Sequence, residues 1–148
     1  MITRRRFLSL TGGLLAAGLL SACMSQDSGE PEVQQVEIAA GDVPQPGAAP
    51  LRNQPGRFFL INNEDGLLAL YTKCTHQGCN VDWEADRDRF HCPCHGSIFD
   101  RYGEVSSGPA GRPLDLMTVT VQPNGGVLVT TAPITEREEW EPSQSVQT

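Results

Sequence analysis

Two short stretches rich in cysteine and histidine constrain this chain more than any other feature of its sequence. The first reads CTHQGC over residues 74–79 and the second CPCHGS over residues 92–97, with 12 residues between them. Together they hold two of the chain's three histidines and four of its five cysteines. Thiolates and imidazoles at such short spacing are typical metal ligands, so the pattern predicts two loops that supply one metal centre.

The candidate ligands follow the order Cys-x-His, 15 intervening residues, Cys-x-x-His, and they are Cys74, His76, Cys92 and His95. Two thiolates and two imidazoles are the ligand set of a Rieske 2Fe-2S centre, with the cysteines on one iron and the histidines on the other. Neutral imidazoles reduce the negative charge around the cluster, which moves the potential from roughly −400 mV for plant-type clusters to about −150 to +300 mV. The same set could form a tetrahedral structural zinc site. That alternative leaves Cys79 and Cys94 without a role.

The two stretches resemble those of the Rieske iron-sulfur proteins of the cytochrome bc1 and b6f branch, which read CTHxGC and CPCHGS. The resemblance extends over roughly residues 33–131. It implies a small antiparallel β-sandwich with a cluster-binding subdomain of two loops. It also implies a disulfide between Cys79 and Cys94 that joins these loops, and a cluster-covering proline loop at Gly108, Pro109 and Ala110.

Three positions near the two stretches bear on how such a cluster behaves. In the bc-type family, a serine and a tyrosine hydroxyl near the second stretch donate to cluster sulfurs and raise the potential. Ser97 matches the serine, whereas Phe99 stands at the tyrosine position, so an intermediate potential is implied. Gln77 stands where these proteins usually carry a leucine between the cluster and the quinol pocket, and is therefore a second departure from the family.

Residues 1–23 are typical of an export signal with an attachment point for lipid. The sequence TRRRFL at residues 3–8 contains a twin arginine that resembles a Tat signal. The apolar run at residues 10–20 contains three glycines and is shorter than the roughly 20 residues of a membrane span. Residues 20–23 read LSAC and resemble a lipobox, which predicts cleavage and acylation at Cys23. The alternative is an uncleaved anchor helix, and both place the domain on the outer face of the bacterial cytoplasmic membrane.

The rest of the chain predicts a linker, one all-β domain and a tail. Residues 24–32 are polar and carry a glycine and a proline, as linkers do. Residues 33–132 show short β-branched and apolar runs between turn signals and no sustained helical period. Strands are expected at 33–39, 57–61, 67–71, 81–83, 89–91, 116–122 and 127–129, with a Pro/Gly-rich loop at 41–56. Residues 133–148 predict an acidic, mobile tail, and a partner-binding tail anchored by Trp140 is the alternative.

The charge of the exported part excludes some classes of partner. Residues 24–148 contain 8 of the 11 basic residues and all 18 acidic residues, which gives a net charge of −10. This balance argues against nucleic acid and against an anionic membrane surface as the binding partner.

These features together predict one-electron transfer, because a Rieske centre has no open iron position for a substrate. The resemblance implies the iron-sulfur subunit of a membrane quinol:cytochrome c oxidoreductase. Its partners would be a cytochrome b-type or other quinol-oxidising membrane subunit, and a cytochrome c or cupredoxin as acceptor. Two alternatives remain at this stage. One is the Rieske small subunit of a periplasmic molybdenum oxidoreductase resembling arsenite oxidase, and the other is a structural zinc module.

Overall fold

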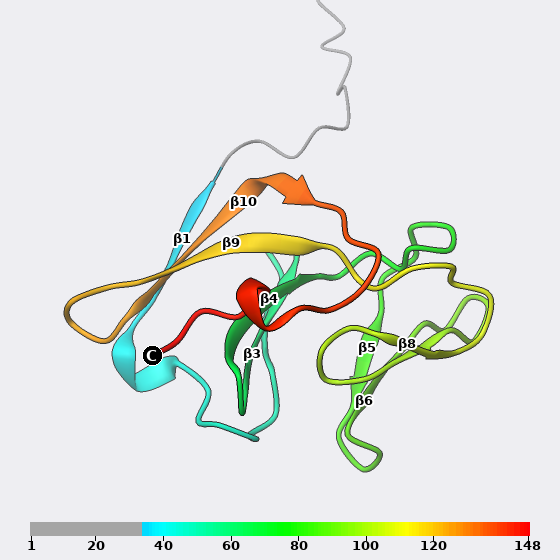
Figure 1. Ribbon diagram of the computed structural model, residues 1–148, viewed down its shortest axis with the longest axis horizontal. Coiled ribbons are helices and arrows are strands. Elements are labelled where there is room, and N and C mark those ends of the chain that lie inside the picture. Colours follow the sequence, from blue (N-terminus) through cyan, green and yellow to red (C-terminus); the bar gives the residue numbers. More distant parts are fainter. Residues whose placement is uncertain (1–33) are drawn as a thin grey trace, which may run out of the picture. The chain divides into compact units, whose positions relative to one another are not determined.

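Short apolar strands and tight turns give the chain two antiparallel sheets in the computed structural model, which describes residues 34–148 (Figure 1). The remaining regular structure is two three-residue 3-10 turns, η1 (Ala40–Asp42) and η2 (Pro142–Gln144). Within the described range, no helix is both long and apolar enough to cross a membrane. The expected signal, the lipidation site at Cys23 and the linker at 24–32 lie outside the described residues.

The large sheet has six strands, and every neighbouring pair in it is antiparallel. Their order across the sheet is β1 (Gln35–Ile38), β10 (Val127–Thr135), β9 (Leu116–Val121), β4 (Gly66–Tyr71), β3 (Phe58–Asn63) and β2 (Leu51–Asn53). The Asp-Gly signal forms the expected β3–β4 hairpin, in which Asn63 pairs with Gly66. Gly66 has a φ of 110°, a conformation that glycine adopts without strain.

The β3–β4 hairpin is buried on both faces and holds the core together. Residues of one face pack with those of β1, β9 and β10 in a single cluster: Phe58, Leu60, Leu67, Ala69, Ile38, Met117, Val127 and Val129. Because strands from both ends of the sheet share this cluster, the sheet folds over itself as a sandwich. Residues of the other face pack toward the smaller sheet and the candidate metal ligands: Phe59, Ile61, Leu68, Leu70, Phe90, Phe99, Cys74 and Cys92.

The small sheet has four strands in sequential order: β5 (Asp82–Glu84), β6 (Arg89–His91), β7 (Ile98–Phe99) and β8 (Val105–Ser107). Figure 1 shows it beside the β3–β4 hairpin. The first Cys/His stretch lies between β4 and β5, and the second joins β6 to β7. One aromatic contact connects the two sheets, because the ring centroids of Phe90 and Phe59 lie 5.0 Å apart. Within the small sheet, Phe90 lies 4.8 Å from Trp83. Both Cys/His stretches therefore border the small sheet.

The C-terminal residues differ from the expected mobile tail. Strand β10 continues to Thr135, and residues 136–147, here called the C-terminal strap, then pack on the domain. Val146 exchanges two backbone hydrogen bonds with Leu67, at 2.9 and 3.0 Å. The Trp140 ring lies 4.4 Å from that of Tyr102, and Arg137 is buried. Backbone pairing, one buried arginine and the Trp140 ring hold the strap. The expected mobility was inferred from the scarcity of apolar residues, and neither backbone pairing nor a buried arginine changes that scarcity.

Candidate metal centre

The two Cys/His loops have the same backbone frame. In the first, the Cys74 N–H donates to the Cys79 carbonyl at 2.7 Å and the Gly78 N–H donates to the Cys74 carbonyl at 2.8 Å. In the second, Cys92 donates to Ser97 at 2.8 Å and Gly96 donates to Cys92 at 3.0 Å. The glycine of each frame is left-handed, with φ of 73° at Gly78 and 74° at Gly96. Each loop thus turns back on its own first cysteine.

The first cysteine of each loop points into the core as a free thiol. Cys74 and Cys92 are the free cysteines of the described residues, and their exposed fractions are 2% and 1%. Burial raises the pKa of the Cys74 thiol, while hydrogen bonds from the His76 backbone N–H and the Ser97 hydroxyl act in the opposite direction. A metal ion that binds such a sulfur displaces its proton. The two thiols therefore suit metal ligation at the buried side of the site.

The two histidines lie together on the outer side of the loops. The rings of His76 and His95 are edge to face, with centroids 4.8 Å apart. His95 is exposed and His76 half-buried. The Nδ1 atom of His76 is buried and has no hydrogen-bond partner among residues 34–148, which leaves it available as a ligand atom. Two buried thiols and two adjacent imidazoles fit a mixed nitrogen and sulfur iron centre.

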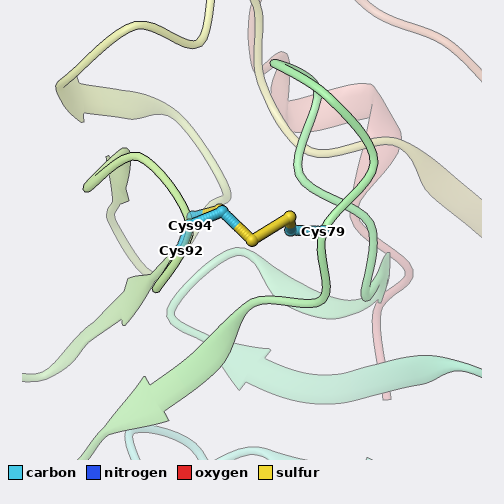
Figure 2. Close-up of side chains that lie close together, drawn as sticks. All are labelled: Cys79, Cys92 and Cys94. Carbon is cyan, nitrogen blue, oxygen red and sulfur yellow. A yellow bond between two sulfur atoms is a disulfide. The ribbon is translucent and has the colours of Figure 1, made fainter.

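Cys79 and Cys94 join the two loops by a disulfide, the pairing that the family resemblance implied. Figure 2 shows this bridge with Cys92 beside it, and the sulfur atoms of the three residues lie within 4.8 Å of one another. This trio is no metal site, because a sulfur in a disulfide offers no thiolate to a metal ion. The bridge joins the two loops while Cys92 remains a free thiol.

The proline loop packs directly on the second Cys/His loop. The Ala110 N–H donates to Ser97 Oγ at 3.2 Å. A Cβ atom on Gly108 would lie 2.5 Å from the Ser97 Cα, and the φ of Gly108 is 98°. Only glycine allows this approach without a shift of the backbone. The first loop has its own contact, in which Thr75 Oγ1 donates to the Arg112 carbonyl at 2.6 Å.

The expected tuning residues occupy three different environments. Ser97 is fully buried, and its hydroxyl lies within hydrogen-bonding reach of the Cys74 sulfur. Because Ala110 donates to the Ser97 oxygen, the serine hydrogen is left to donate to that sulfur. Phe99 is fully buried in the core beneath the loops and offers no donor, whereas Gln77 is exposed. The structure thus places one side-chain donor, Ser97, beside the sulfur of Cys74, a candidate ligand.

Buried cysteines and paired histidines, held by two bridged loops on an all-β domain, define an iron-sulfur electron-transfer protein. Residues 26–123 match the family model of the Rieske [2Fe-2S] domain. Since this match covers more than half of the chain, the protein belongs to the Rieske [2Fe-2S] family, and its relatives support the bc1/b6f type. Its cofactor is accordingly a Rieske 2Fe-2S cluster and not a structural zinc ion.

Several curated relatives are subunits of cytochrome b6-f complexes. Iron-sulfur subunit 1 from the cyanelle of Cyanophora paradoxa is 49% identical over 72 residues, which are 47% of this chain and 30% of that protein. Iron-sulfur subunit 2 of Nostoc sp. strain PCC 7120 is 45% identical over 67 residues, or 43% of this chain and 38% of that protein. The matched part of this chain thus spans about a third of the length of these relatives.

Solved structures of Rieske proteins overlap this chain in part. The plasma membrane Rieske protein of Synechocystis PCC 6803 is 34% identical, with a TM-score of 0.45, over 54% of this chain and 82% of that chain. The ferredoxin of carbazole 1,9a-dioxygenase from Nocardioides aromaticivorans is 23% identical, with a TM-score of 0.43, over 65% of this chain and 96% of that chain. The family assignment depends on the sequence match and not on these overlaps.

Contacts outside the two stretches were not apparent from the sequence. The carbonyl of Arg112 supports the first loop, and Arg137 lies buried beside the segment that carries the proline loop. In each case at least one partner is a main-chain carbonyl, which no residue pattern identifies. The only signal available was the presence of Thr75 within the first stretch.

Proposed function

We propose that this chain carries single electrons as the iron-sulfur subunit of a membrane quinol-oxidising complex of the bc type. The observation that carries the proposal is the adjacent pair of His76 and His95 at the outer side of the loops, above two buried free cysteines. The b6-f subunits among its relatives support the same assignment. The part played by a cytochrome b-type membrane subunit is inferred from the complexes to which those relatives belong.

At the outer side of the two loops, here called the tip, electron transfer can be coupled to transfer of a proton. When bound, the cluster takes up one electron and passes it on. His76 has its Nδ1 atom buried and without a partner, so its Nε2 atom is left to exchange a proton with a quinol. The exposed imidazole of His95 can do the same. The protein residues thereby offer a proton acceptor within the same site that receives the electron.

Gln77 distinguishes this tip from an apolar one. Its side chain is exposed between the two ends of the first loop. The amide can donate and accept hydrogen bonds, so a docking surface for this tip would present polar groups at that position. Electrons would pass on to a cytochrome c or a cupredoxin outside the cytoplasm.

Export and anchoring complete the proposal. The twin arginine at Arg4 and Arg5 would direct the folded domain across the cytoplasmic membrane, and acylated Cys23 would hold it on the periplasmic face. Mass spectrometry of the mature N-terminus tests this directly. A lipid-modified chain that begins at Cys23 is expected, and lysine at both Arg4 and Arg5 should abolish export. An unmodified chain that begins at residue 1 would identify an uncleaved anchor instead.

Purification of the native membrane complex tests the main assignment. The chain should copurify with a cytochrome b subunit, and its cluster should be reduced when a quinol is added to that complex. A complex that contains a molybdopterin subunit and no cytochrome b would contradict the proposal and favour the molybdenum oxidoreductase. Slower reduction in a Gln77→Leu variant, with an unchanged potential, would place Gln77 at the donor interface.

A further inference from the structure

Arg137 is a buried arginine in the C-terminal strap. Its exposed fraction is 6%. The guanidinium donates from Nε to the Leu114 carbonyl at 2.8 Å, from Nη1 to Gln144 Oε1 at 2.9 Å, and from Nη2 to the Tyr102 carbonyl. Burying a cation is costly unless each donor finds a partner. The two carbonyls that accept these bonds are therefore held at fixed positions relative to one guanidinium plane.

Those two carbonyls lie at the base of one excursion of the chain, residues 103–114. The Leu114 N–H donates to the Gly103 carbonyl at 2.9 Å, which closes the excursion on itself. A Cβ atom at Gly103 would lie 2.6 Å from Arg137 Nη2. The guanidinium thus packs against the closing pair and links both stems of the excursion.

The same excursion supplies a hydrogen bond to each cluster loop. Its Ala110 N–H donates to Ser97 Oγ at 3.2 Å, next to the sulfur of Cys74. Its Arg112 carbonyl accepts from Thr75 Oγ1 at 2.6 Å. The excursion is therefore the element that connects Arg137 to the surroundings of the cluster.

We propose that Arg137 is a positioning residue for the cluster: it fixes the base of the 103–114 excursion and thereby sets the hydrogen bond of Ser97. Arg137 lies beyond residue 123, where the family match ends. The proposal concerns the cluster site alone, and it holds whether the electron donor is a quinol or another reductant.

The first test replaces Arg137 in the exported, cluster-containing domain. Arg137→Gln should lower the reduction potential, the direction expected from a weaker Ser97 donor. A threefold change in the redox equilibrium is expected, which corresponds to about 28 mV at about 59 mV per tenfold for one electron. Hydrogen exchange of peptides from residues 103–114 should become at least threefold faster. Arg87→Gln is the matched control, because Arg87 is an exposed arginine in the turn between β5 and β6, and it should change neither quantity.

A second variant separates position from charge. Loss of a cation near the cluster would also lower the potential, so Arg137→Lys keeps the charge and removes the planar fork that serves both carbonyls. Arg137→Lys should still lower the potential and speed exchange in 103–114. If Arg137→Gln yields no folded protein, Arg137→Lys alone decides the question.

A double-variant cycle identifies the route. In a Ser97→Ala background, Arg137→Lys should cause less than half of the potential shift that it causes in the native protein, because the affected hydrogen bond is already absent. A full shift in that background would overturn the proposed route. So would an Arg137→Lys protein with a lowered melting temperature but native potential and native exchange, since Arg137 would then only stabilise the fold.

Discussion

The two cluster loops share one backbone frame, yet equivalent positions in them do different work. The carbonyl that accepts from the first cysteine belongs to Cys79 in one loop and to Ser97 in the other. Cys79 forms the covalent bridge to Cys94, whereas the Ser97 hydroxyl faces the Cys74 sulfur. The comparison shows that a single loop geometry places both free cysteines, the candidate iron ligands, while the closing position carries a disulfide cysteine in one loop and the candidate tuning residue in the other.

The strongest test concerns what the loops have in common. Cys74→Ser and Cys92→Ser should each abolish the cluster, since each cysteine is the buried ligand of its loop. Elemental analysis of the native domain should find two irons and two acid-labile sulfides, and reduced protein should give a rhombic spin-resonance signal. Stoichiometric zinc without such a signal would break the comparison entirely.

The next largest effect tests the disulfide formed by Cys79, the residue at the closing position of the first loop. Cys79→Ala and Cys94→Ala should destabilise the domain by the same amount, because each removes the same bridge. Closing a loop across a sequence separation of 15 contributes roughly 3 kcal/mol in the chain-entropy model. Chemical denaturation measures it. A Cys79→Ala protein with an unchanged melting temperature and a full cluster would contradict the assigned role.

The shared backbone frame predicts that equivalent glycine substitutions in the two loops lower the stability of the domain equally. Gly78 and Gly96 are both left-handed, and a Cβ atom at either would meet nothing within 4 Å. Gly78→Ala and Gly96→Ala should therefore each cost only the backbone strain, about 1–2 kcal/mol. Gly111→Ala is the control, since that glycine has open space and no left-handed φ. Urea unfolding that gives clearly unequal losses for Gly78 and Gly96 would show that the frames differ energetically.

The electronic role of the second loop's closing position predicts a smaller effect. A hydrogen bond to a charged acceptor contributes about 1.5–3 kcal/mol, and part of this differs between the redox states. Since about 1.4 kcal/mol corresponds to about 59 mV for one electron, Ser97→Ala should lower the potential by on the order of 50–100 mV. Voltammetry measures it, with exposed Ser106→Ala as the control. A shift below about 20 mV would remove the distinction between the loops.

The smallest effect concerns the pH dependence of stability and Tyr102, which packs against Trp140 of the strap. Burial, together with the hydrogen bond to Asp65, raises the pKa of Tyr102 from 10.0 to about 12. Above pH 10 the unfolded chain loses this proton before the folded one does, so stability should fall between pH 10 and about 12. Tyr102→Phe should remove that part of the alkaline loss. Identical alkaline profiles for the two proteins would contradict the raised pKa.

Patterns that repeat along the chain predicted most of the large sheet. The Asp-Gly turn between two apolar runs and the Asn-Gly-Gly turn before residue 127 both lie in the hairpins expected of them. Three short strands were missed, at 51–53, 98–99 and 105–107. Each of these three strands has only two or three residues, and pairing with neighbouring strands defines them.

Residue identity predicted the candidate ligands and the bridge, because their spacing and family resemblance are distinctive. Residue identity could not predict that Arg137 is buried or which groups it contacts. An arginine in an acidic segment is ordinarily an exposed charge, and its carbonyl partners belong to residues 102 and 114, far away in the sequence. Every residue has a main-chain carbonyl, so the residue type at an accepting position does not reveal such a contact. The strap was expected to be mobile for the same reason.

The closeness of three sulfur atoms sets an order in which this protein must be made. Cys79, Cys92 and Cys94 lie within 4.8 Å of one another, so an oxidant that meets the apo domain has three pairs to choose from. Two of those pairs contain Cys92 and would consume a ligand by thiol–disulfide exchange. Iron bound at Cys92 would protect that thiol, and of these three pairs only Cys79 with Cys94 would remain. Cluster insertion in a reducing compartment, followed by oxidation of the folded domain, would therefore yield one product where the reverse order would yield a mixture, and the proposed export of a folded domain follows the first order.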